Sequence, residues 1–151
     1  MAVEKDDLVR ALRAEVPHYA AIASSLGPEA TPALEELAAS DDTALASRAA
    51  TVAAYLTPDS ARTVLRRAAA HHDPVVRVSA AAALGRQPEL SSELTGQLLT
   101  DTDPGVRKWT LRSLQTVRPV GYREQVAGLA RSERVPFLRD LAHEVARQLP
   151  S

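Results

Sequence analysis

The chain reads DPVVRVSAAAALG over Asp73–Gly85, and a related stretch, DPGVRKWTLRSL, follows over Asp103–Leu114. Both stretches begin as helices do. The aspartate can accept hydrogen bonds from the free N–H groups of a first helical turn, and a proline at the first helical position loses no hydrogen bond there. The sequence therefore predicts helices that begin at Pro74 and Pro104, and Gly85 is expected to end the first of them in a left-handed conformation.

The residues after each aspartate-proline pair recur at the spacing of one helix face. These residues are Val76, Ala80, Ala83 and Leu84 in the first copy, and Val106, Thr110, Ser113 and Leu114 in the second. Positions three, four or seven residues apart lie on the same side of a helix, so this side is expected to be buried. Aromatic residues are only 3% of the chain, so the core must be built from alanine, leucine and valine.

Prolines mark a repeat of about thirty residues. One series, spaced 30, 30 and 31 residues apart, opens the first helices of four units, and a second series, spaced 30 and 32 apart, opens second helices. The first series is Pro28, Pro58, Pro88 and Pro119, and the second is Pro74, Pro104 and Pro136. A fixed period with two helices in each period is typical of a solenoid.

The period predicts a single domain, 1–151, of about five helical pairs. The units are expected to span about 4–26, 28–56, 58–86, 88–117 and 119–149. The first unit is short and irregular, with helices expected over about 4–15 and 17–26. It is interpreted as an N-terminal cap, which a stack of repeats needs to cover its open apolar end.

The pattern D-P-x-V-R-x-x-A-A-x-A-L-G of the first stretch resembles a HEAT repeat of the PBS-lyase-like subclass. In that family the motif is the second helix of a two-helix unit. The resemblance implies an all-α fold, a right-handed α-solenoid. It also implies that the aspartates and arginines of the motif form a structural ladder between neighbouring units, and the matching residues are Asp73, Arg77, Asp103 and Arg107.

The outer units depart from this pattern. In the second unit Ala46 stands at the expected arginine position and Arg48 follows two residues later; in the fifth unit Leu138 is expected to replace the arginine. The apolar face of the fifth unit is assigned to Phe137, Leu141, Ala142 and Val145. The ladder is therefore expected to have two clear arginine rungs.

Composition narrows the class of protein. The chain has no cysteine, which excludes disulfides, thiolate zinc sites and a cysteine nucleophile, and which fits a reducing compartment. The first residues contain no apolar segment of the kind that signal peptides carry, and no apolar run approaches the ~20 residues that a membrane-spanning helix needs. These features favour a cytoplasmic location.

The side of the second helices opposite the buried face is the most informative candidate site. It is expected to be the concave face of the stack and to carry cations with the single tryptophan and one tyrosine: Arg48, Tyr55, Arg86, Lys108, Trp109, Arg112, Arg139, His143 and Arg147. Helical arrays use such surfaces for binding. Net charge is −1, but residues 1–57 hold four basic and nine acidic side chains, whereas residues 58–118 hold nine and six.

The sequence therefore favours a small intracellular interaction module or adaptor that binds an acidic protein segment, with Trp109 as an anchor. Two simpler interpretations stay open. The long cationic side chains can merely solvate a helix face, and Trp109 can be half-buried between units. No cofactor is predicted.

Nucleic-acid binding is the alternative, because DNA glycosylases of the HEAT-like type also use a basic concave face, and Trp109, Asp140 and Tyr55 are candidates for such a role. Against it, the pI of the sequence is 6.4, and nucleic-acid binders usually show a pI above about 9. A bilin-lyase-like or other enzyme role is the third alternative. No catalytic residue or metal ligand is assigned, since the run His71-His72-Asp73 is expected to be a connector.

Overall fold

The computed structural model describes residues 4–151, which form ten α-helices and three short 3-10 helices and no strand. The α-helices are α1 (Lys5–Leu12), α2 (Tyr19–Ser24), α3 (Thr31–Ala38), α4 (Thr43–Ala53), α5 (Pro58–Ala69), α6 (Pro74–Ala83), α7 (Ser91–Leu99), α8 (Pro104–Val117), α9 (Arg123–Ser132) and α10 (Pro136–Gln148). The 3-10 helices are η1 (Pro28–Ala30), η2 (Leu84–Arg86) and η3 (Pro88–Leu90).

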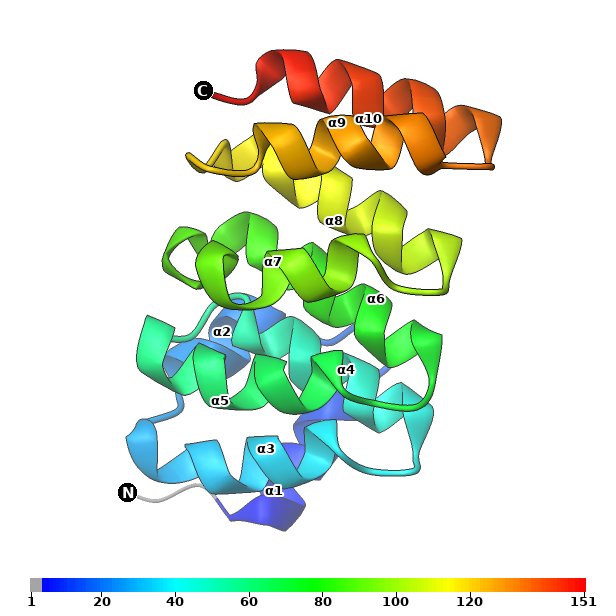
Figure 1. Ribbon diagram of the computed structural model, residues 1–151. Coiled ribbons are helices and arrows are strands. Elements are labelled where there is room, and N and C mark those ends of the chain that lie inside the picture. Colours follow the sequence, from blue (N-terminus) through cyan, green and yellow to red (C-terminus); the bar gives the residue numbers. More distant parts are fainter. Residues whose placement is uncertain (1–3) are drawn as a thin grey trace.

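The helices are stacked in two layers (Figure 1). The first helices, α3, α5, α7 and α9, lie side by side in one layer, and the second helices, α4, α6, α8 and α10, lie behind them in the other. Each second helix packs against the next, so that α6 contacts both α4 and α8. Helices α1 and α10 lie at opposite ends of the stack. This is an α-solenoid, as the sequence predicts.

The predicted starts of the second helices are confirmed. Asp73 accepts a hydrogen bond from the Val75 amide, and Asp103 accepts from the amides of Gly105 and Val106. A proline follows directly in both α6 and α8, where its lack of an N–H group costs nothing. These caps fix the register of each helix, and the register decides which side chains face inward.

The predicted inner faces of α6 and α8 are buried. All eight residues of the two faces are at most 6% exposed, and Thr110 and Ser113 satisfy their hydroxyl groups by donating to the carbonyls of Val106 and Ala81. Buried apolar residues form two clusters, which adjoin at α8: Val106 belongs to the cluster on the N-terminal side, and Leu111 to the one on the C-terminal side. Helix α8 therefore connects the two halves of the core.

The expected role of Gly85 is wrong. It lies inside η2, and within residues 4–151 the only glycine with a positive φ is Gly121. A Cβ at position 85 would lie 3.3 Å from the Ser113 hydroxyl oxygen, so this glycine permits η2 to approach α8 closely. The predicted helices of the first unit, 4–15 and 17–26, are also too long, since α1 ends at Leu12 and α2 spans only Tyr19–Ser24.

Candidate functional site

Two arginines link successive second helices through paired hydrogen bonds. Nε and Nη2 of Arg77 donate to the two carboxylate oxygens of Asp101 at 2.9 and 3.1 Å. The same two nitrogens of Arg107 donate to the two oxygens of Glu133, both at 2.8 Å. The third nitrogen, Nη1, donates to carbonyls of the connector before its own helix, those of His71 and His72 in the case of Arg77. The ladder therefore exists, with Arg77 and Arg107 as its donors.

The acidic partners differ from those that the family resemblance implies. Asp73 and Asp103 cap helices, and the carboxylates of the ladder belong to Asp101 and Glu133, two residues before the cap positions of α8 and α10. A residue at this place is held by its neighbour: Asp101 accepts the amide hydrogen of Asp103, and Glu133 accepts that of Val135. The connector thus orients the carboxylate toward the arginine of the preceding unit.

In the run His71-His72-Asp73 a side chain also accepts the amide hydrogen of the residue two positions later. Nδ1 of His71 accepts the amide hydrogen of Asp73 at 3.0 Å, and Nε2 lies 2.8 Å from the Ser40 carbonyl, to which it donates in this tautomer. Asp73 also accepts from the hydroxyl of Thr43 in the preceding unit. Helix α4 has Ala46 at the position that Arg77 occupies in α6, so no arginine can bind this connector from the preceding unit. The contacts of His71 and Asp73 with Ser40 and Thr43 link the two units instead, and the run is a structural connector.

Burial and hydrogen bonding set the charge state of the ladder. Hydrogen bonds from Arg107 lower the pKa of Glu133, and the same bonds raise the pKa of Arg107. For Asp101 burial acts in the opposite direction, but hydrogen bonds from Arg77 and from the Asp103 amide outweigh it, so its pKa is also lowered. The Glu133 side chain is only 2% exposed. Both carboxylates are therefore held in the ionised form.

The register of α10 corrects the expectation for the fifth unit. Helix α10 begins at Pro136, so Arg139 stands four residues after the cap position, as Arg77 and Arg107 do after theirs. Leu138 is buried and does not replace the arginine. Arg139 therefore occupies the ladder position, although it forms no ion pair within residues 4–151.

The same register moves His143 and Arg147 away from the other candidates. His143 corresponds to Ala81 in α6, whose carbonyl accepts a hydrogen bond from Ser113 of the following helix. This side of each second helix faces the next unit. With Arg139, both residues therefore lie on the exposed outer side of α10, at the C-terminal end of the stack.

Arg48 lies at the opposite end. Its Nη1 donates to the carbonyls of Leu12 and Ala14 at 2.6 and 2.9 Å and so caps the C-terminal end of α1. With Leu12 and Arg13 it lines a hollow that is separate from the remaining candidates. Its guanidinium group therefore stabilises the first unit of the stack.

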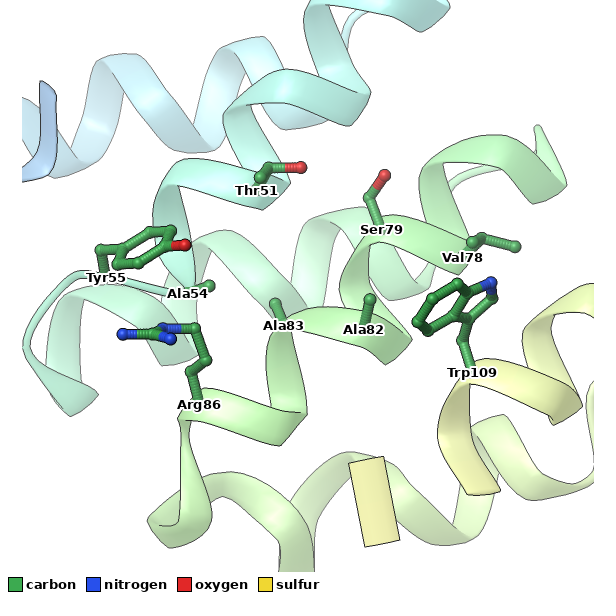
Figure 2. Close-up of a pocket in the computed structure, with 9 residues that line it drawn as sticks. All are labelled: Thr51, Ala54, Tyr55, Val78, Ser79, Ala82, Ala83, Arg86 and Trp109. Atoms are coloured by element: carbon green, nitrogen blue, oxygen red, sulfur yellow. The ribbon is translucent and has the colours of Figure 1, made fainter. Parts of the chain in front are cut away.

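The remaining candidates lie close together: Tyr55 closely follows α4, Arg86 ends η2, and the others belong to α8. Trp109 stands at one end of a hollow of about 320 Å³, and Tyr55 and Arg86 stand side by side at the other (Figure 2). The Arg86 guanidinium carbon lies 4.3 Å from the centre of the Tyr55 ring, a cation-π contact. The other lining residues are small or medium in size: Thr51, Ala54, Val78, Ser79, Ala82 and Ala83.

A second hollow, of about 250 Å³, continues from the first. It shares Ala82, Arg86 and Trp109 with the first and adds Arg112 and Thr116, as well as Gly85 and Ser113. The two hollows together are called the groove below. The groove therefore brings together Tyr55, Arg86, Trp109 and Arg112, which the sequence places on one face.

Sequence reasoning missed Phe137. It was assigned to the buried face of α10, but it is 53% exposed, and its ring lies 5.8 Å from Lys108 Nζ and 6.0 Å from the Arg112 guanidinium carbon. Lys108 Nζ also lies 5.7 Å from the Trp109 ring. The signal was present in the sequence, because counting from Pro136 instead of from the apolar pattern puts Phe137 outside the core.

The cations of this surface lack acidic partners. Arg86 and Arg112 line the groove, and Lys108 lies at its edge over Trp109; these three, called the groove cations below, form no ion pair within residues 4–151. Arg112 donates only to the amide oxygen of Gln115. Over the same range no carboxylate lines either hollow. An anion that approached the groove would therefore meet cations free to bind it.

The comparison with protein families agrees with this geometry. The family model for HEAT repeats matches residues 30–115, from η1 to α8. The chain belongs to the HEAT-repeat family. No curated protein matches it significantly.

HEAT repeats are commonly protein-interaction modules. In this HEAT array the matched region includes the helices α4, α6 and α8 that form the groove. Helices α9 and α10 follow the matched region; the connector between them supplies Glu133, and α10 supplies Phe137. No helix within residues 4–151 combines the length and apolar character needed to cross a membrane.

Proposed function

We propose that this HEAT array is an interaction module that binds an acidic segment of a protein partner through the groove. The observation that carries the proposal is the group of groove cations, which have no acidic partner and which stand beside exposed aromatic rings. Trp109 and Tyr55 are 42% and 39% exposed. Tryptophan, tyrosine and arginine are the residues most enriched at interface hot spots.

The charge of the groove favours an anionic segment over an apolar or basic one. A partner carboxylate that binds Arg86 or Arg112 forms charge-assisted hydrogen bonds, which are stronger than neutral ones. It also accelerates the encounter by electrostatic attraction. Since these side chains reach solvent, the attraction is expected to weaken as salt is added.

The number of groove cations favours protein over nucleic acid. Non-specific nucleic-acid binding sums several phosphate contacts, whereas the groove offers only Arg86 and Arg112, with Lys108 beside it over the Trp109 ring. The sequence pI of 6.4 also lies below the usual range of nucleic-acid binders. Duplex DNA is therefore the competitor to include in the test.

The assignment to the PBS-lyase-like subclass of HEAT repeats is part of the proposal. Three second helices begin with proline followed three residues later by arginine: Pro74 and Arg77, Pro104 and Arg107, and Pro136 and Arg139. Two of these arginines connect units, which is a scaffold role. The subclass therefore supports the fold and adds no chemistry to the groove.

The test compares partner capture by the parent protein and by a charge-reversed groove. The groove variant is Arg86→Glu/Arg112→Glu, and the control is Arg131→Glu, an exposed residue of α9 in the other layer. Proteins from a lysate of the source cells are quantified on each variant. We expect the specific partners to be retained by the control and lost from the groove variant.

Two results would contradict the proposal. One is an identical set of partners on the parent and the groove variant, which would move the interaction elsewhere on the molecule. The other is binding of labelled duplex DNA that the groove variant abolishes and that falls steeply with salt, because this is the behaviour of a phosphate-dominated site.

A further inference from the structure

The first hollow exists because α6 carries small residues where α8 carries large ones. Six residues after the cap position stands Ser79 in α6 and Trp109 in α8; nine residues after it stands Ala82 in α6 and Arg112 in α8. The indole of Trp109 therefore projects over the smaller side chains of α6, as Figure 2 shows. The hollow is thus a property of this sequence and not of the repeat in general.

The lining of this hollow is mainly apolar. Ala54, Val78, Ala82 and Ala83 contribute methyl groups, and Trp109 contributes an aromatic ring. A volume of about 320 Å³ stands at the lower limit of small-molecule pockets, which run from about 300 to 1,000 Å³. A space of this size and character suits one apolar side chain of a partner.

The cations stand at the edges of this apolar space. The contact with the Tyr55 ring fixes Arg86 at one end, and Arg112 stands with Arg86 and Trp109 around the second hollow. A carboxylate in the second hollow would therefore meet two guanidinium groups. Guanidinium-carboxylate pairs are directional as well as strong, so they can also set the register of a bound segment.

We propose that the groove recognises a composite motif: one apolar side chain of leucine, methionine or phenylalanine size, with a carboxylate within a few residues of it. The apolar side chain enters the first hollow between Trp109 and Tyr55, and the carboxylate binds Arg86 and Arg112. This inference rests on the proposed function and specifies the partner's sequence. Burial of the apolar side chain supplies most of the affinity, and the carboxylate supplies orientation.

The first experiment selects ligands from a short randomised peptide library displayed on phage, with the full chain as bait. The expected result is enrichment of peptides that hold one fixed apolar position close to Asp or Glu. Acidic peptides without a fixed apolar position would overturn the composite motif and leave the proposed function standing. If the library yields no enrichment, or yields basic peptides, both proposals fail.

The second experiment fills the first hollow without changing charge. Ala82→Leu places a larger side chain on its floor, and Ala70→Leu makes the same change at an exposed site at the end of α5. The probe is the best selected peptide, and the readout is the fluorescence of Trp109, the single tryptophan. We expect binding to weaken by about tenfold or more in Ala82→Leu alone.

Both substitutions are at exposed positions and introduce a good helix former, so the thermal melts of the two variants should match that of the parent. Equal peptide affinity in Ala82→Leu and Ala70→Leu would overturn the motif. A matched peptide in which serine replaces the apolar residue gives a check that needs no protein variant, and it should bind the parent about tenfold more weakly or worse.

Discussion

The ladder and the groove use the same residue type in opposite ways. Arg77 and Arg107 each bind a carboxylate through two hydrogen bonds and also donate to backbone carbonyls, and they are mostly buried. Arg86 and Arg112 lie on the same second-helix layer, are exposed, and have no acidic partner within residues 4–151. The charges of the ladder arginines are neutralised by carboxylates inside the fold, whereas those of the groove arginines face solvent, where a partner can reach them.

This difference separates scaffold from candidate site more clearly than residue type does. A buried charge that loses its partner is costly, because the remaining charge stays out of water. Removing an exposed charge changes the free energy of unfolding little. The ladder should therefore control stability, and the groove cations should control binding, with little overlap between the two effects.

The largest expected effect is on the ladder. Arg107→Ala leaves the Glu133 carboxylate buried without its partner, and removing one member of a buried pair costs about 3–5 kcal/mol. The measurement is the free energy of unfolding in urea. The double variant Arg107→Met/Glu133→Leu should recover much of the loss, since a buried pair can often be replaced by apolar residues.

An Arg107→Ala protein as stable as the parent would remove the structural role assigned to the ladder. A double variant that is less stable than the single one would show that the pair does more than neutralise a buried charge.

The second-largest expected effect is a loss of stability at acid pH, when the carboxylates of the ladder are protonated. The pKa values of Asp101 and Glu133 are lowered in the folded protein, while in the unfolded chain they stand near ~3.9 and ~4.3. Their contribution is therefore complete above about pH 5 and is lost as pH falls through the lowered folded values, because the unfolded state binds protons first. Urea midpoints measured at a series of pH values should fall steadily below about pH 4.

Glu133→Gln provides the comparison for the acid series. It should be less stable than the parent at neutral pH and should lose less stability on acidification, since one of the coupled carboxyl groups is gone. Parallel pH profiles for this variant and the parent would contradict the assignment of acid sensitivity to Glu133.

The smallest expected effect on stability is at the groove. Arg112→Ala removes an exposed side chain that donates only to Gln115, so the free energy of unfolding should change by no more than about 0.5 kcal/mol. Its acid profile should match that of the parent, because no shifted carboxyl group contacts it. A loss as large as that of Arg107→Ala would erase the distinction between the two sets of cations.

Four of the candidate residues that the sequence places on one face also lie close together in the structure. Tyr55, Arg86, Trp109 and Arg112 lie together because caps fix the register of α4, α6 and α8, and Tyr55 and Arg86 closely follow the first two of these helices. Lys108 lies beside this group, over Trp109. In these helices a correct cap was enough to place the side chains, since the helical period then carries the register forward.

Four candidate residues do not lie where the sequence predicts, for two different reasons. For Arg139, His143 and Arg147, the apolar pattern of the last unit gives a register one residue away from the observed one, although Pro136 marks the correct start of α10. Arg48 could not be placed in this way. Its register is as expected, but its long side chain reaches the carbonyls of Leu12 and Ala14 in the first unit, and no local pattern shows where α1 ends relative to it.

The sequence by itself determined the repeat, and it determined the starts and buried faces of α6 and α8, because proline, capping aspartate and helical periodicity act over a few residues. Only the tertiary structure decided which charges are neutralised. Arg77 meets Asp101 and Arg107 meets Glu133 across units, whereas Arg86 meets only an aromatic ring. A hydrogen-bonded ion pair needs its two groups about 3 Å apart, so it depends on distances that are set when the helices stack.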